Sequence, residues 1–210
     1  MIHVVPKLEP PDFDRLVRKP GLKYLVKKPK PDASGWKNHD YWREILKDLR
    51  KSYNEICAYS CHWIPADTGS STVEHFLPKS KYPQKAYEWS NYRLVYATLN
   101  GRKGNREDIL DPFAIEDGWF IIEFPSLLVK PSSLVDDNCA NKIKVTIECL
   151  GLNDEGTCLK SRERYIKDYC LEEINFHHLC KAAPFIAKEL TRQNLVDSIK
   201  QMMVYSQDYD

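Results

Sequence analysis

Three short pieces of sequence decide the fold: Thr72-Val73-Glu74-His75-Phe76-Leu77-Pro78, then Trp89-Ser90-Asn91-Tyr92-Arg93-Leu94, then Asn100-Gly101-Arg102-Lys103-Gly104. The first piece is β-prone and stops at a proline, so it predicts a strand over 72–76. An acid and a histidine stand side by side near the end of that strand. Carboxylate and amide oxygens suit a hard cation such as Mg²⁺, and an imidazole can accept a proton at neutral pH.

These pieces, with Cys57-Ala58-Tyr59 before them, resemble the HNH endonuclease family in their order and spacing. The resemblance implies a ββα-metal finger that hydrolyses phosphodiester bonds. In such a finger His75 is the general base, and Glu74 and Asn100 hold one Mg²⁺ or Mn²⁺ ion. Asn91 is the asparagine that braces the connecting loop and so orients His75.

Basic residues around the finger are the expected contacts to DNA. Arg102 and Lys103 follow Asn100 by about one helical turn, so we expect them to reach phosphate oxygens, and Lys103 to assist catalysis. Lys79 and Lys81 are further candidates for DNA binding. A solvated basic face explains these two lysines at least as well.

Two departures from the family pattern affect the metal chemistry. The acid is Glu74 where aspartate is commoner, and the last ligand is Asn100 rather than histidine, which favours a hard metal over zinc. Family members often bind structural zinc through two Cys-x-x-Cys pairs. Here one pair is loosened to Cys57 and Cys61, and the other is replaced by the apolar Tyr96 and Leu99. We therefore expect no structural zinc, and we interpret both cysteines as packing residues.

Each of these residues also has a plainer explanation. A lone histidine such as His75 is usually a hydrogen-bonded core residue, and Glu74 could pair with a nearby lysine. The asparagines could be turn residues. The second class of function is thus a DNA-binding or adaptor module that keeps the finger only as a fold and leaves catalysis to a partner.

Composition limits the classes of protein to which this chain can belong. The chain has 210 residues and 42% hydrophobic residues, enough for one good core, and no apolar run long enough to cross a bilayer. Its first residues lack the apolar core of a signal peptide, so we expect a cytoplasmic protein without membrane contact. Seven cysteines in such a chain predict reduced thiols.

Charge is distributed unevenly along the chain. Residues 1–106 carry 20 Lys and Arg against 11 Asp and Glu, whereas residues 107–210 carry 11 against 19. This pattern suggests that the first half meets a polyanion and that the second faces water or a protein. Chance clustering on solvated faces explains it about equally well.

The predicted fold is α+β, with the finger embedded in a largely helical scaffold that has a few extra strands. We divide it into a basic, proline-rich N-terminal arm (1–39), a helix plus the nuclease finger (40–112), and a mixed strand and helical C-terminal region (113–210). The arm is expected to be extended, with at most a short helix, because it holds several prolines. Further predicted elements are a helix over 40–56, strands over 119–124 and 144–150, and helices over 162–174 and 182–203.

The flanks extend the resemblance. The phrases Leu8-Glu9-Pro10-Pro11-Asp12 and Leu110-Asp111-Pro112-Phe113 resemble small bacterial HNH proteins, including the Septu-type and retron-linked nucleases of anti-phage defence. This resemblance implies an ABC-type ATPase partner, with the acidic C-terminal half as its surface and any oligomer formed through it. Deleting residues 157–210 is then expected to abolish the complex. No recognition helix is evident, so we expect DNA nicking of low sequence specificity.

Overall fold

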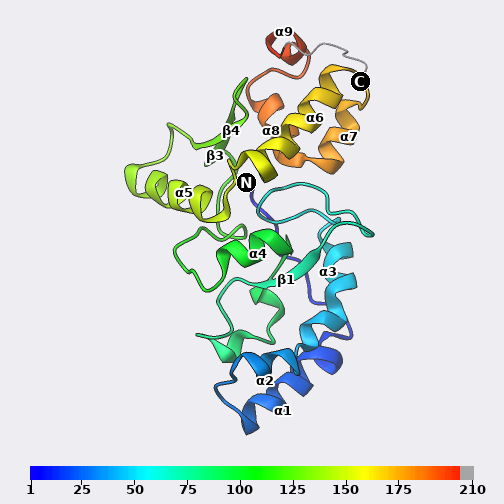
Figure 1. The fold of residues 1–210 in the computed structure, drawn as a ribbon, viewed down its shortest axis with the longest axis vertical. Helices are drawn as coiled ribbons and strands as arrows, with labels where there is room; N and C mark the ends of the chain where they lie inside the picture. The colour runs from blue at the N-terminus through cyan, green and yellow to red at the C-terminus, as the bar shows by residue number, and fades with distance from the viewer. Residues whose placement is uncertain (204–210) are drawn as a thin grey trace.

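The computed structural model describes residues 1–203 and shows helices around two separate two-stranded antiparallel sheets (Figure 1). Helix makes up about 47% of the chain and strand about 10%, so the α+β prediction is confirmed. The first sheet pairs β1 (Ser71–His75) with β2 (Tyr92–Tyr96), and the second pairs β3 (Phe120–Glu123) with β4 (Leu128–Pro131).

The molecule is elongated, with residues up to about 112 in its lower part and the later residues above them in Figure 1. The N-terminal segment runs between the two parts. The Val4 amide donates to the Pro112 carbonyl at 2.9 Å, and the His3 amide donates to Asp117 Oδ1 at 3.0 Å. Buried side chains form one continuous core through both parts.

The N-terminal region is helical, so the prediction of an extended arm is wrong. A π-helical turn η1 (Asp14–Arg18) continues into α1 (Lys19–Lys27), and α2 (Ala33–Lys37) follows. Pro20 is the second residue of α1, directly after the π-helical turn, and the chain stays helical through it. Phe13 is fully buried, which makes this region part of the core rather than a free arm.

The helix expected over 40–56 is present as a 3-10 turn η2 (Tyr41–Ile45) that continues into α3 (Leu46–Ser52). Trp42, Ile45 and Leu49 are buried, which is the spacing of one helical face. Helix α3 packs against both strands of the first sheet, so this face supports the finger.

The finger itself consists of β1, β2 and α4 (Ala97–Lys103) in that order. Its strands pair in a register that places Glu74 opposite Arg93 and His75 opposite Tyr92. The loop between the strands contains two 3-10 turns, η3 (Pro83–Lys85) and η4 (Trp89–Asn91). Gly104, with φ of 51°, ends α4 in a backbone conformation that favours glycine.

The strand predicted over 144–150 is wrong, because these residues belong to the long helix α5 (Asp137–Leu150). Asp136 caps this helix by accepting a hydrogen bond from the Cys139 amide at 2.8 Å. Gly151, with φ of 60°, ends it. Buried Ile143, Ile147 and Leu150 follow a helical spacing that outweighs the β-branched composition of the segment.

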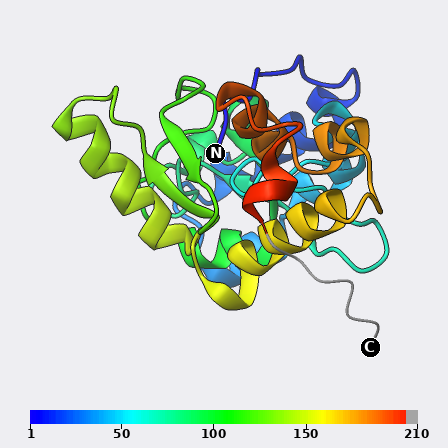
Figure 2. The same ribbon diagram turned by 90° about the horizontal axis from the view of Figure 1, so that it is seen from above.

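The strand expected over 119–124 is confirmed as β3, and the C-terminal part is helical as predicted. Its elements are η5 (Glu155–Leu159), α6 (Lys160–Cys170), α7 (Phe176–Ala182), α8 (Pro184–Arg192) and α9 (Ile199–Met202). The helix expected over 182–203 is interrupted between α8 and α9. Figure 2 shows the second sheet between α5 on one side and these helices on the other. Residues 204–210 of the expected C-terminal region lie outside the described residues.

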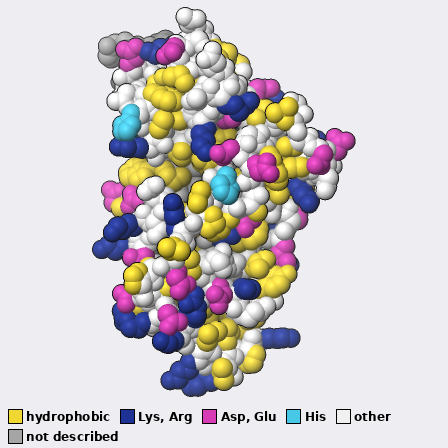
Figure 3. Space-filling view, turned by 180° about the vertical axis from the view of Figure 1, so that it is seen from behind, with side chains coloured by type: hydrophobic (Ala, Val, Ile, Leu, Met, Phe, Trp, Pro, Cys, Tyr) yellow, Lys and Arg dark blue, Asp and Glu magenta, His cyan; other side chains and the backbone are white. Residues whose placement is uncertain are grey.

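The surface carries both signs of charge, and Lys and Arg side chains gather at its lower end in Figure 3, the end formed by α1 and α2 in Figure 1. Within residues 1–203, no helix combines the length and apolar character that crossing a membrane requires.

Candidate active site

His75 lies at the end of β1 with only 6% of its surface exposed. Its Nε2–H donates to the Ala86 carbonyl at 3.0 Å, and a carbonyl only accepts, so this contact places the ring proton on Nε2. The rings of Trp42 and Tyr92 meet it edge-on, with centroids at 4.7 and 5.1 Å. Among the described residues Nδ1 has no partner. The ring is thus fixed in orientation with one nitrogen left as an acceptor.

Asn91 holds the loop that binds His75. Its Oδ1 accepts from the Leu77 amide at 2.8 Å, and its Nδ2 donates to the carbonyls of Leu77 and Lys85, each at 3.0 Å. Lys85 directly precedes Ala86, whose carbonyl accepts from the histidine. The amide therefore makes the loop contacts that the sequence predicts, and it acts on His75 through the backbone.

Glu74 and Lys103 form a buried ion pair. Lys103 Nζ lies 2.8 Å from Glu74 Oε1, and the two side chains are 0% and 2% exposed. The same ammonium donates to the His75 carbonyl at 3.3 Å. Burial raises the pKa of Glu74 to about 7, although the nearby lysine acts in the opposite direction. The structure thus places Lys103 inside the finger, away from the surface where a phosphate contact was expected.

Asn100 faces the same side of β1 as Glu74. Its Nδ2 donates to Thr72 Oγ1 at 3.1 Å, and Thr72 and Glu74 share a strand face because side chains alternate. Lys103 follows Asn100 by one helical turn and also faces β1. Helix α4 therefore brings its amide and its ammonium to the strand that carries Glu74.

Two side chains would supply oxygen ligands to a hard divalent cation at this position. The donors are a carboxylate oxygen from Glu74 and the amide oxygen of Asn100, whose nitrogen is already engaged. Mg²⁺ is commonly bound through one or two protein oxygens, with water and phosphate completing its shell. Within residues 1–203 no group of three or more His, Cys, Asp and Glu side chains could hold a metal, so the finger offers this sparse oxygen set only.

The other basic candidates take different positions. Arg102 donates to the Leu150 carbonyl at 2.9 Å and pairs with Asp154 at 2.7 Å, so it caps the end of α5. Lys81 pairs with Glu107 at the surface. Lys79 stays near the finger: its Nζ lies 5.3 Å from the Trp42 ring, and burial lowers its pKa.

The two cysteines expected to pack are buried free thiols. Cys57 and Cys61 are 0% and 1% exposed. Leu99, at one of the positions where the resemblance to HNH proteins would put a second cysteine pair, is buried as well. At the other position, Tyr96 donates its hydroxyl to the Trp63 carbonyl at 2.6 Å.

The sequence did not single out two side chains that shape the site. Tyr92 donates its hydroxyl to the Ala86 carbonyl at 2.7 Å, so it shares that acceptor with His75. Trp42 packs on the imidazole from η2. Tyr92 directly follows Asn91, which is a signal that could have found it, whereas only the folded structure brings Trp42 to the site.

Comparisons with known proteins give one relevant likeness. The chain is similar to "Septu protein PtuB" of Bacillus thuringiensis, with 28% identity over 105 residues. That stretch covers 50% of this chain and 39% of the relative's length. No family model matches the chain. The likeness agrees with the Septu-type resemblance that the sequence motifs indicate.

Proposed function

We propose that this chain is a metal-dependent endonuclease of the HNH type that hydrolyses DNA phosphodiester bonds, one strand at a time and with low sequence specificity. The observation that carries the proposal is the arrangement around His75. A ββα finger fixes the imidazole through Nε2 while Nδ1 has no partner among the described residues.

His75 is the proposed general base. Burial lowers its pKa to about 3, so the ring is neutral at pH 7 and Nδ1 can accept a proton from water. A phosphate anion next to the ring raises that pKa again and makes the ring a better base. Asn91 and Tyr92 are positioning residues, because they hold the loop and the Ala86 carbonyl that orient the ring.

Glu74 and Asn100 are the proposed ligands of Mg²⁺ or Mn²⁺, which would stabilise negative charge on the phosphate and on the leaving oxygen. Besides the proposed metal ion, Lys103 supplies a second positive charge at the site. Its ammonium neutralises Glu74 in the fold and lies beside the His75 carbonyl. Lys79 is the basic candidate best placed to contact DNA near the finger.

The likeness to a Septu protein supports a role in anti-phage defence, in which the chain acts beside an ABC-type ATPase. The structure changes how that partnership is tested. Deleting residues 157–210 removes Ile166, Leu179 and Phe185 from the core, so the deletion would unfold the protein. Co-purification of the intact chain with a candidate ATPase is the appropriate test.

One observation favours the adaptor function instead. Lys103 satisfies the charge of Glu74 without any metal, as a purely structural pair would. The adaptor has no need of the histidine's free nitrogen, so the two functions differ in their dependence on His75.

A supercoiled-plasmid assay separates them. Purified protein is incubated with Mg²⁺ or Mn²⁺, with EDTA as the metal-free control. His75→Ala is compared with His177→Ala, which removes an exposed histidine on α7. The nuclease predicts metal-dependent nicking that only His75→Ala abolishes. Nicking that survives His75→Ala contradicts His75 as the general base, and no nicking with and without a candidate ATPase favours the adaptor.

A further inference from the structure

An open groove lies on the far side of α4 from Glu74, between the finger and the C-terminal helices. Two adjoining cavities of about 530 and 400 Å³ form it, and each is of a size that binds a small ligand. They share His62 and Tyr96 on one wall and Ser161 and Arg164 on the other. We call this feature the α4–α6 groove.

Hydrogen bonds around Trp63 connect the two walls of the groove and fix its shape. The Trp63 amide donates to the Ala182 carbonyl at 2.8 Å, which ties the finger side to the end of α7. The Tyr96 hydroxyl donates to the Trp63 carbonyl, and the Trp63 indole donates to Glu55 at 2.9 Å. The Trp63 ring is thus oriented in advance although 41% of its surface is exposed.

Cations dominate the wall formed by the C-terminal helices. Lys160, Arg164 and Lys181 are exposed there, and Asp168 is the single carboxylate among the lining residues. Arg164 has 85% of its side chain exposed and touches Asp168 only at 3.9 Å. Within residues 1–203 the two lysines have no ion pair. These cations belong to the half of the chain in which Asp and Glu outnumber Lys and Arg. The local composition therefore does not explain the basic wall.

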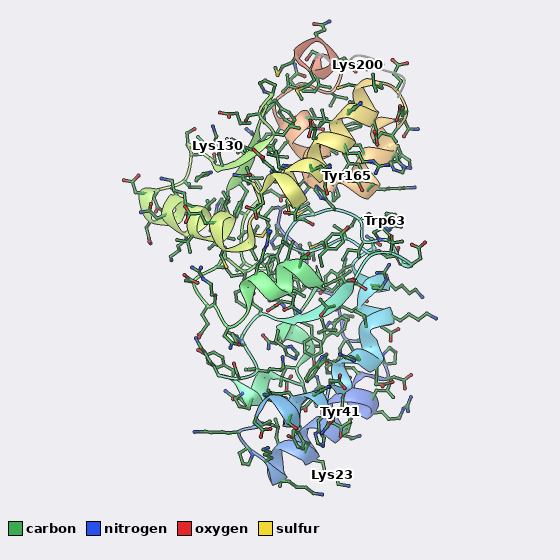
Figure 4. The ribbon with its side chains drawn as sticks, in the orientation of Figure 1. Lys23, Tyr41, Trp63, Lys130, Tyr165 and Lys200 are labelled. Atoms are coloured by element: carbon green, nitrogen blue, oxygen red, sulfur yellow. The ribbon has the colours of Figure 1, made fainter. Side chains whose placement is uncertain are left out.

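Aromatic rings lie beside these cations. Trp63 and Tyr165 both line the larger cavity, and Figure 4 labels them at the junction of the two parts of the molecule. The ring of His62 lies between the cavities, 5.4 Å from that of Tyr165, and only 4% of it is exposed. Aromatic faces next to cations suit a ligand that has both a planar base and a phosphate.

We propose that the α4–α6 groove binds a nucleotide, with its base against Trp63 and Tyr165. Its phosphate lies against Arg164, which lines both cavities, and Lys181, which lines the larger cavity beside the two rings. The nucleotide belongs either to a nucleic-acid strand or to a free nucleoside phosphate, which share this chemistry. The site goes beyond the proposed nuclease function, because neither Glu74 nor His75 lines the groove.

The test measures binding in EDTA, so cleavage by the finger does not enter. A fluorescein-labelled oligothymidylate of about six nucleotides is titrated with the intact chain by anisotropy, and ADP is titrated separately by calorimetry. We expect Arg164→Glu to weaken binding of the ligand about tenfold or more. Lys167→Glu, which reverses an exposed charge on α6 outside the groove, is the matched control and keeps affinity within about twofold.

Trp63→Ala provides a second variant, with thermal melting as the check on folding. It is expected to weaken binding severalfold without lowering the melting temperature by much. Oligonucleotide binding that Arg164→Glu weakens assigns the groove to a strand, and binding of ADP alone that Arg164→Glu weakens assigns it to a free nucleotide. The proposal is overturned if neither ligand binds, or if the groove variants bind as tightly as the Lys167→Glu control.

Discussion

The finger and the α4–α6 groove lie on opposite sides of α4 and differ in the burial and pairing of their polar side chains. In the finger Glu74 is buried against Lys103, and the Asn91 amide makes three hydrogen bonds to its loop. In the groove Lys160 and Lys181 are exposed and have no ion pair within residues 1–203. Folding thus depends on the finger's polar groups, whereas the groove's charges contribute little to it and remain available to a ligand.

The largest expected effect is on the buried pair. Lys103→Met leaves the Glu74 carboxylate buried without its cation, so we expect a loss of about 3–5 kcal/mol in the free energy of unfolding near pH 8. The loss is smaller near pH 5.5, where Glu74, with its pKa raised to about 7, is protonated. Chemical denaturation at both pH values measures it.

The double variant Glu74→Gln with Lys103→Met is the control, since it removes both charges and should recover most of the stability. If Lys103→Met lowers the unfolding free energy no more than replacing an exposed lysine does, Glu74 and Lys103 do not form a buried ion pair.

Asn91→Ala should have the next largest effect. It leaves the Leu77 amide and carbonyl without their partners and removes one of two hydrogen bonds to the Lys85 carbonyl, which costs about 2–3 kcal/mol of unfolding free energy. Asn138→Ala, at an exposed position on α5, should be close to neutral. Equal unfolding free energies for Asn91→Ala and Asn138→Ala would contradict the loop-bracing role of Asn91.

The pH dependence of stability tests His62, a groove residue that is both buried and titratable. Burial lowers the pKa of His62 to about 3, with Arg162 and the N-terminal amine acting in the same direction. The unfolded ring titrates near 6.5, so its contribution is complete above that pH and is lost as the pH falls towards 3. Between pH 7.5 and 5 this amounts to about 2 kcal/mol.

His62→Gln should therefore lose less stability than the native chain over this interval, as measured by denaturation at the two pH values. Burial also lowers the pKa of His75, so part of the pH dependence of stability remains in both proteins. An unchanged pH dependence in the variant would mean that His62 is not buried as a neutral ring.

The smallest expected effect is in the groove's charged wall. Lys181→Ala should change the unfolding free energy by less than about 0.5 kcal/mol, because an exposed cation without an ion pair stabilises little. A larger loss, measured by the same denaturation, would show that Lys181 has a structural partner and would weaken the contrast with the finger.

The sequence predicted the finger well because its residues lie within one short stretch. The resemblance of these short phrases to the HNH family implied a ββα unit, and β1, β2 and α4 follow one another in that order. The same local evidence could not show that Lys103 turns inward to Glu74 or that Arg102 caps α5, since both contacts depend on packing.

The groove could not be predicted for a related reason. Its walls come from residues near 60, 96, 160 and 181, which only the fold brings together. The two wrong element predictions also reflect tertiary context. Prolines in residues 1–39 fall where helices begin or lie between them, and the β-branched run over 144–150 is held in α5 by its cap and its buried face.

The most direct test of the division between finger and groove uses the single variant His75→Ala in two assays on one preparation. The account predicts that metal-dependent plasmid nicking falls by about 100-fold or more. It also predicts that binding of the groove's ligand in EDTA stays within about twofold of the native value. Nicking that persists, or binding that is lost together with nicking, would contradict the account.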